Sequence, residues 1–249
     1  MEWNAENYAE VCGRVTERGG RLVDVLRKLR CKKVLDIGCG TGVLTNEIAK
    51  FAQEVIGIDS SPAMIEKAKA TYPGLKFFMM DACSLRCGHD FDAVFSNAVF
   101  HFIPSQDALL RGIHEVLSPK GALVFEFGAA GNIAGLLDAV AQACAKRGKP
   151  YALRFYYPTE TEYGHLLEKH GFSIESIVTY DLDTSLRGGE SGLRNWINQI
   201  FCIEMEWFDA REREEVLREI EAVLRSAQWD GAAWHLPNRR LQAVARLRA

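Results

Sequence analysis

The sequence has little excess charge of either sign and no long apolar run. Its formal net charge is −3 at pH 7 and its pI is about 6.1, so it lacks the positive field that collects DNA or RNA. No run approaches the ~18 apolar residues of a membrane span. The first residues, MEWNAENYAEVCGRV, contain no apolar core of signal-peptide length. These absences predict a cytoplasmic protein that acts on small molecules, with no nucleic-acid or membrane partner.

Cysteine occurs in an odd number that is spread over the chain. The seven residues are Cys12, Cys31, Cys39, Cys83, Cys87, Cys144 and Cys202. Only Cys83 and Cys87 lie close together, and no second pair stands at the spacing of metal ligands. We therefore expect reduced, mostly buried thiols and no metal site.

Short apolar runs alternate with helical patterns over the first half of the chain. The runs VLDI, VIGI, FFMM, DAVF and ALVFEF begin at residues 34, 55, 77, 92 and 122. Ser61 followed by Pro62 is typical of a helix start, and SPKG at 118–121 is typical of a helix end. This alternation predicts βαβ units and a mostly parallel sheet with helices on both faces.

The second half of the chain is predominantly helical. We expect an alanine-rich helix within 129–147, a helix over 158–171, and strands at 172–180 and 239–247. With the five earlier runs, these strands predict an α/β, Rossmann-like sheet of seven strands, with a helical cap inserted late in the chain. The expected parts are an N-terminal arm and core over 1–128, a cap segment over 129–157, a core helix and strand over 158–181, a cap insertion over 182–236 and a closing core strand over 237–249.

The segment VLDIGCGTG at 34–42 places three glycines directly after an apolar strand. Such a strand must turn sharply and lets a ligand approach the backbone, and glycine permits both. The helix that follows directs its N-terminal amides and the positive end of its dipole into the same space, which favours a nucleotide-type ligand. The dinucleotide fingerprint needs glycine or alanine at position 43, where this chain has Val43, so the spacing disfavours NAD.

Two aspartates end the next two predicted strands. Asp59 stands where a carboxylate can accept hydrogen bonds from both ribose hydroxyls, and Asp81 follows the third strand. The ends of parallel strands meet at one edge of a sheet. We therefore expect the glycine turn and both aspartates to line one site.

These segments resemble the class I S-adenosylmethionine-dependent methyltransferases. Within residues 30–128 the resemblance is carried by VLDIGCGTG, GIDSSPAMIEKA, DA at 81–82, FDAVFSNAVFHF and LSPKGALVFEF. Beyond them, EFGAAGNI, YYPTETEYGHLLEKHGF, GLRNWI and the arginine-rich last strand are similar to the trans-aconitate methyltransferase branch. The resemblance implies S-adenosylmethionine as the cofactor and methyl transfer to a small-molecule acceptor.

The resemblance also implies which residues hold the cofactor. Its methionine part is expected against Asp36, Gly38, Cys39, Gly40 and Asn97, its ribose against Asp59 and Ser60, and its adenine against Asp81 and Ala82. The reaction is an in-line displacement. Holding the reactants aligned can supply about 7–11 kcal/mol of the barrier reduction in favourable cases, and a cover that excludes water prevents side reactions.

The acceptor decides which further groups are needed. A carboxylate acceptor requires cations and no base, and the candidates in or near the expected cap are Arg154, Arg187 and Arg194. A hydroxyl or amine acceptor requires a base, for which His101 is the candidate. Trp3 and Tyr8 are candidates to close the other side of the substrate site.

Other functions stay open at this point. The acceptor could be larger, such as a carrier-protein-bound acid or a protein side chain. Alternatively, the chain could bind the cofactor without catalysis, as a sensor or a partner subunit, although a sensor has little need for an extensive cap. RNA methylation is the least favoured, because no basic or aromatic-interleaved surface segment is evident. The sequence leaves both the methylated atom and the oligomeric state undetermined.

Overall fold

The computed structural model describes residues 19–248, and within them seven strands form one sheet. The strands are β1 (Lys33–Ile37), β2 (Glu54–Asp59), β3 (Lys76–Met79), β4 (Phe91–Asn97), β5 (Leu117–Gly128), β6 (Phe172–Ser185) and β7 (His235–Leu247). Their order across the sheet is β3-β2-β1-β4-β5-β7-β6. All pairs are parallel except those of β7, which runs antiparallel to β5 and β6. The predicted seven-stranded, mostly parallel α/β sheet is therefore confirmed.

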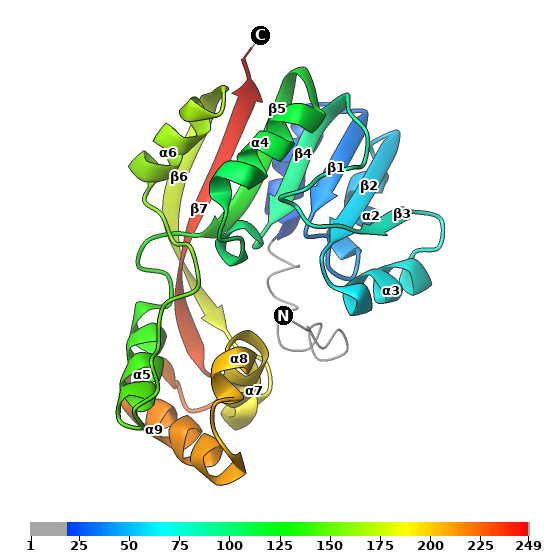
Figure 1. Ribbon diagram of the computed structural model, residues 1–249. Helices are drawn as coiled ribbons and strands as arrows, with labels where there is room; N and C mark the ends of the chain where they lie inside the picture. Colours follow the sequence, from blue (N-terminus) through cyan, green and yellow to red (C-terminus); the bar gives the residue numbers. More distant parts are fainter. Residues whose placement is uncertain (1–18, 249) are drawn as a thin grey trace.

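Helices cover both faces of this sheet (Figure 1). They are α2 (Val43–Ala49), α3 (Pro62–Thr71), α4 (Gln106–Val116) and α6 (Glu160–Lys169), together with the helical residues 19–28. Helices α4 and α6 bury Leu109 and Leu167 on one face, while residues 19–28 and α2 bury Leu22 and Ile48 on the other. Parallel strands with apolar side chains on both faces need this double cover.

Local sequence signals fix several of the helix ends. Helix α3 begins at Pro62, and the amide of Met64 donates to the hydroxyl of Ser61, as the serine–proline pair predicts. Helix α6 begins with a capping box in which Thr159 and Glu162 bond each other's backbone amides. Helix α4 ends at Val116, but β5 begins already at Leu117, because Leu117 pairs with Phe91 on β4. The segment SPKG is thus part of a strand.

A helical cap lies beyond the last residues of β6 and the first residues of β7 (Figure 1). Its helices are α5 (Ala134–Ala145), α7 (Gly192–Ile200), α8 (Cys202–Met205) and α9 (Ala210–Gln228), which enclose a hydrophobic core of their own. Strand pairing continues into the cap as far as Ser185 opposite His235. Both strands are therefore longer than predicted at 172–180 and 239–247, because each supplies the hydrogen-bond partners of the other.

None of the helices within residues 19–248 combines the length and the hydrophobicity that crossing a membrane requires. The cysteines of this described part are all free thiols, and Cys31, Cys39 and Cys144 are buried. Cys12 lies outside the described residues.

Candidate functional site

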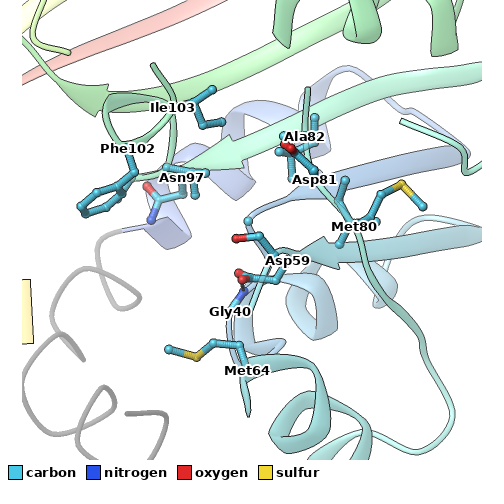
Figure 2. A pocket seen from close by; sticks show the side chains of 15 residues that line it. Gly40, Asp59, Met64, Met80, Asp81, Ala82, Asn97, Phe102 and Ile103 are labelled. Atoms are coloured by element: carbon cyan, nitrogen blue, oxygen red, sulfur yellow. Dashed lines mark hydrogen bonds between the residues drawn. The ribbon is translucent and has the colours of Figure 1, made fainter. Parts of the chain in front are cut away.

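The carboxyl ends of β1, β2, β3 and β4 surround a cavity of about 260 Å³. The cavity lies where the strand order changes direction, between β1 and β4, which is where ligands bind in open α/β sheets. Its lining comprises Ile37, Gly38, Gly40, Ile58, Asp59, Ser60, Met64, Met80, Asp81, Ala82, Asn97, Ala98, Val99, Phe102 and Ile103. Figure 2 shows Gly40 and Asp59 between Asp81 on one side and Asn97 on the other.

The glycine turn shapes the floor of the cavity. Gly38 has φ of +72°, and a Cβ atom at this position would lie 2.1 Å from a methyl group of Val99, so no other residue fits. Gly40 has φ of +53°, and a Cβ atom there would meet no atom of residues 19–248 within 4 Å. Its missing side chain leaves open space at the cavity wall, as a ligand that contacts the backbone requires.

Asp59 is held in place by backbone donors on either side. The amide of Gly40 donates to Oδ2 at 3.0 Å and the amide of Ser61 donates to Oδ1 at 2.9 Å. Burial raises the pKa of the Asp59 carboxyl, and these amide donors act in the opposite direction. Each oxygen keeps a second lone pair, so the fixed carboxylate can still accept hydrogen bonds from a ligand.

Asp81 and Ala82 form the third strand end of the cavity. The Oδ1 atom of Asp81 accepts from the amide of Cys83 at 2.8 Å, which orients the exposed carboxylate at the start of a turn. Ala82 is 9% exposed and follows directly. The chain places both residues, with Ser60, on the lining of the same cavity as Asp59.

Asp36 and Cys39 do not belong to the cavity lining. Asp36 is buried, the hydroxyl of Thr45 donates to its Oδ2 at 2.6 Å, and burial raises its pKa to about 7. The Cys39 side chain packs with Ile65 and Phe77 under the glycine turn, where burial raises the pKa of its thiol far above the usual range. Both residues support the turn from behind, and their predicted cofactor contacts stay predictions.

Asn97 ends β4 and lines the cavity next to the short helix η1 (Phe100–Phe102). His101 lies within η1, is 6% exposed, and is not part of the lining. Its Nδ1 accepts from the amide of Gly128 at 3.3 Å, and burial lowers its pKa well below the usual value. A neutral ring that accepts at Nδ1 carries its proton on Nε2. The general-base role of His101 stays a prediction, and this arrangement gives it no support.

The candidate substrate arginines lie in the cap rather than on the cavity wall. Arg154 donates from Nε to Glu204 at 2.8 Å and also bonds the carbonyl of Ile200. Arg194 bonds Glu221 at 2.5 Å and Glu214 at 2.7 Å. These two guanidinium groups thus join cap helices to one another.

The other candidates for substrate contact are placed differently. Arg187 is exposed in the loop between β6 and η2 (Gly189–Ser191). Trp3 and Tyr8 lie outside the described residues. The substrate roles of these three residues and of Arg154 and Arg194 stay predictions.

The sequence interpretation missed the apolar part of the lining. Met64, Met80, Val99, Phe102 and Ile103 contribute to the cavity wall. Met64 lies in the first turn of α3, directly after the segment that carries Asp59, so its position offered a signal. The others follow strand ends as well, but in sequence they cannot be told from core residues.

Comparison with known proteins agrees with this geometry. A family model described as a methyltransferase domain matches residues 34–121. An uncharacterized methyltransferase of Schizosaccharomyces pombe, C70.08c, is 30% identical, and the match covers 98% of this chain and 97% of the relative. The trans-aconitate 2-methyltransferase of Methylobacterium radiotolerans is 31% identical over 73% of this chain and 67% of the relative.

The fold is also found among solved structures. The YcgJ protein of Bacillus subtilis superimposes with a TM-score of 0.66 at 16% identity, covering 92% of this chain and 99% of that one. At this identity the likeness concerns the fold alone. The match to C70.08c over nearly the whole of both chains carries the family assignment, and the family model covers the strands that surround the cavity. The chain therefore belongs to the class I S-adenosylmethionine-dependent methyltransferases.

Proposed function

We propose that this protein transfers the methyl group of S-adenosylmethionine to a small-molecule acceptor that carries a carboxylate. The observation that carries the proposal is the convergence of Gly40, Asp59, Asp81 and Asn97 on one cavity from four neighbouring strands. The family supplies the reaction, and the named relative that methylates trans-aconitate supports an acid as the acceptor.

The order of the strand ends fits the order of the cofactor's parts. Asp81 on the β3 side suits an adenine amino group, and Asp59 next to it suits the two ribose hydroxyls. The open wall at Gly40 leaves room for the methionine part, and Asn97 at β4 stands at the reactive end. Asp36 lies buried behind the turn, and the positive charge of a methionine amino group on that side would favour its ionised form.

Methyl transfer depends mainly on the alignment of the acceptor with the methyl group of the cofactor. When bound, S-adenosylmethionine supplies a methyl carbon activated by a positively charged sulfur. The protein holds this end against Asn97 and must bring an acceptor oxygen in line with it. A carboxylate oxygen already has a free lone pair at neutral pH, so no side chain has to remove a proton. The unprotonated Nδ1 of His101 already accepts from the amide of Gly128, and His101 is not part of the cavity lining, which is consistent with an acceptor that needs no base.

The test is calorimetric titration of S-adenosylmethionine and its demethylated product into the purified protein, followed by a methyl-transfer assay with di- and tricarboxylic acids. We expect binding of both nucleosides and turnover on an acid. Absence of nucleoside binding would refute the cofactor assignment. Binding with turnover only on amines or alcohols would refute the acid acceptor and leave the cofactor assignment intact.

A further inference from the structure

One arginine of the described chain is buried without a partner. Arg240, on β7, is 8% exposed, and its buried Nε makes no hydrogen bond. Within residues 19–248 no carboxylate lies close enough to its guanidinium to form an ion pair. A buried charge without a partner costs far more free energy than a paired one. Arg240 therefore calls for an explanation that the fold alone does not give.

Strand pairing places Arg240 beside a gap in the sheet surface. On β5 its neighbour is Gly128 and on β6 it is Tyr180. Paired residues on adjacent strands project to the same face, so Arg240 lies on the face where Gly128 lacks a side chain. A Cβ atom on Gly128 would lie 2.4 Å from the ring of Tyr157, which covers the glycine on that face.

Other polar groups surround the same glycine. The amide of Gly128 donates to Nδ1 of His101, and the charge of Arg240 contributes to the lowered pKa of that imidazole. His101 and Tyr157 pack with ring centroids 5.7 Å apart. Arg240, His101 and Tyr157 thus form one polar group around Gly128, which we call the Gly128 cluster.

The Gly128 cluster continues the row of strand ends that forms the cofactor cavity. The row runs from β3 to β4 and on to β5, which ends at Gly128, and the middle of the antiparallel strand β7 lies beside that end. Asn97 pairs with Glu126 on β5, two residues before Gly128. Neighbouring strands are about 4.8 Å apart, which puts Arg240 two strands, or roughly 10 Å, sideways from Asn97, and the offset from Glu126 to Gly128 adds roughly 7 Å along the strands. Phe102, which follows His101, belongs to both regions because it lines the cavity and packs against the imidazole.

A carboxylate is present on the same face, that of Glu126, but it forms no ion pair with Arg240 within residues 19–248. Glu126 accepts a hydrogen bond from the hydroxyl of Tyr180. The arrangement therefore keeps the Arg240 guanidinium available for an anion from outside the described residues. Arginine binds carboxylates through two parallel N–H donors, which adds orientation to affinity.

We propose that Arg240 binds a carboxylate of the methyl acceptor other than the one that is methylated. The proposal rests on the proposed function and makes it more specific. An acid anchored at Arg240 can reach Asn97 with its other end across the spacing of two strands. The protein would then select di- and tricarboxylic acids over monocarboxylic acids, and the anchored anion would align the reacting oxygen with the methyl carbon.

The experiment compares the variants Arg240→Met and Arg240→Lys with a matched control, Arg239→Gln. Arg239 precedes Arg240 on β7, its side chain is half exposed, and it lies 3.9 Å from Asp181. Each protein is saturated with S-adenosylhomocysteine and titrated by calorimetry with trans-aconitate, fumarate and the monocarboxylate crotonate. Thermal unfolding is followed with and without each acid.

We expect Arg240→Met to weaken trans-aconitate and fumarate binding at least about tenfold, the scale of a lost hydrogen bond to a charged group. Crotonate binding should change little, and nucleoside binding should be unchanged. Arg240→Lys should retain part of the affinity, and Arg239→Gln all of it. Without acid, Arg240→Met should unfold at the same or a higher temperature than the wild type, because an uncompensated buried charge has been removed.

The outcomes separate this proposal from the one on which it rests. If the nucleoside fails to bind to the wild type, the proposed function is wrong and the role of Arg240 falls with it. If the nucleoside binds but the wild type binds none of the acids, the carboxylate acceptor and the Arg240 anchor are both refuted. If Arg240→Met binds the acids as the wild type does, or is strongly destabilised, Arg240 is a structural residue and the methyltransferase assignment stands.

Discussion

Charged side chains at the carboxyl ends of the parallel strands, here called the edge, have different surroundings from those in the helical cap. At the carboxyl ends of β1 and β2, Asp36 is buried and Asp59 is partly buried, neither forms an ion pair within residues 19–248, and burial raises the pKa of both carboxyls. In the cap, Arg154 and Arg194 bond carboxylates of neighbouring helices. A charge whose partner is a nearby side chain contributes to the fold. A buried polar group without a charged partner is a candidate for binding a ligand.

Arginine side chains also differ from one another in whether they form ion pairs. Arg154, Arg194 and Arg240 are all at least partly buried, but only the first two form ion pairs within residues 19–248. Their positions in the sequence do not distinguish them. Four changes, taken from the largest expected effect to the smallest, test whether this division between edge and cap holds.

The largest effect concerns the buried carboxyl of Asp36. Its pKa rises from 3.8 to about 7 on folding, so the folded state binds more protons than the unfolded state between these pH values. The contribution of this group to the free energy of unfolding therefore falls by up to roughly 4 kcal/mol as the pH rises from about 4 to about 7. Above pH 7 the contribution stays constant. Asp36→Asn should remove this slope, which urea unfolding at several pH values measures.

The control for Asp36 is Asp138→Asn, a change at an exposed position of α5. Its stability difference from the wild type should not vary with pH. A constant difference between Asp36→Asn and the wild type from pH 4 to 8 would show that Asp36 is ionised throughout.

The second change breaks an ion pair in the cap. Glu204 is 2% exposed, and Glu204→Ala leaves Arg154 without its carboxylate. We expect a loss of about 3 kcal/mol in the free energy of unfolding, the cost of an uncompensated buried charge. Nucleoside affinity should stay the same in the folded protein. Glu206→Ala, at an exposed position nearby, is the control, and equal stability of the two variants would contradict a structural role for the pair.

The third change removes the fixed carboxylate at the edge. Asp59→Ala should weaken nucleoside binding by about 1.5–3 kcal/mol, because hydrogen bonds to a charged group are lost. Calorimetry measures the affinity, and the melting temperature shows whether the turn at Gly40 survives. Glu54→Ala, at the opposite end of β2 beside Lys76, should leave the affinity unchanged. Equal affinities of the two variants would remove Asp59 from the site.

The smallest effect is expected on the outer face of the cap. Arg211 and Glu215 form a pair one helical turn apart in α9, and their side chains are 89% and 47% exposed. Arg211→Ala should change the free energy of unfolding by no more than about 0.5 kcal/mol, because solvent screens such pairs. A loss as large as that of Glu204→Ala in the same urea experiment would show that exposure does not separate the two kinds of pair.

Local patterns were enough to predict the part of the site that lies on consecutive strand ends. The glycine turn, Asp59 and Asp81 each follow an apolar run, and parallel strands bring such ends to one edge. The serine–proline start of α3 was predicted for the same reason, because capping involves residues within one turn. Periodicity and turn chemistry therefore sufficed wherever the interacting residues were close in the chain.

Prediction was weaker where the partners are distant in sequence. Arg154 meets Glu204, which is 50 residues away, and Arg194 meets Glu221 across two helices. The lengths of β6 and β7 were underestimated because each strand extends only as far as the other pairs with it. No local pattern contains this information.

The sequence by itself determined the family, the parallel core and the cavity-lining residues Gly40, Asp59 and Asp81, because these depend on short-range motifs that recur at strand ends. Only the tertiary structure decided that Arg154 and Arg194 form ion pairs within residues 19–248, while the buried Arg240 forms none there. Arg240 differs from its neighbour Arg239 by facing Gly128 rather than the exposed side of the ribbon, and this follows from the antiparallel register of β7 against β5 and β6. A charged side chain indicates a binding site when it is buried away from water and no neighbouring side chain pairs with it. Both conditions arise only when strands that are distant in sequence pair.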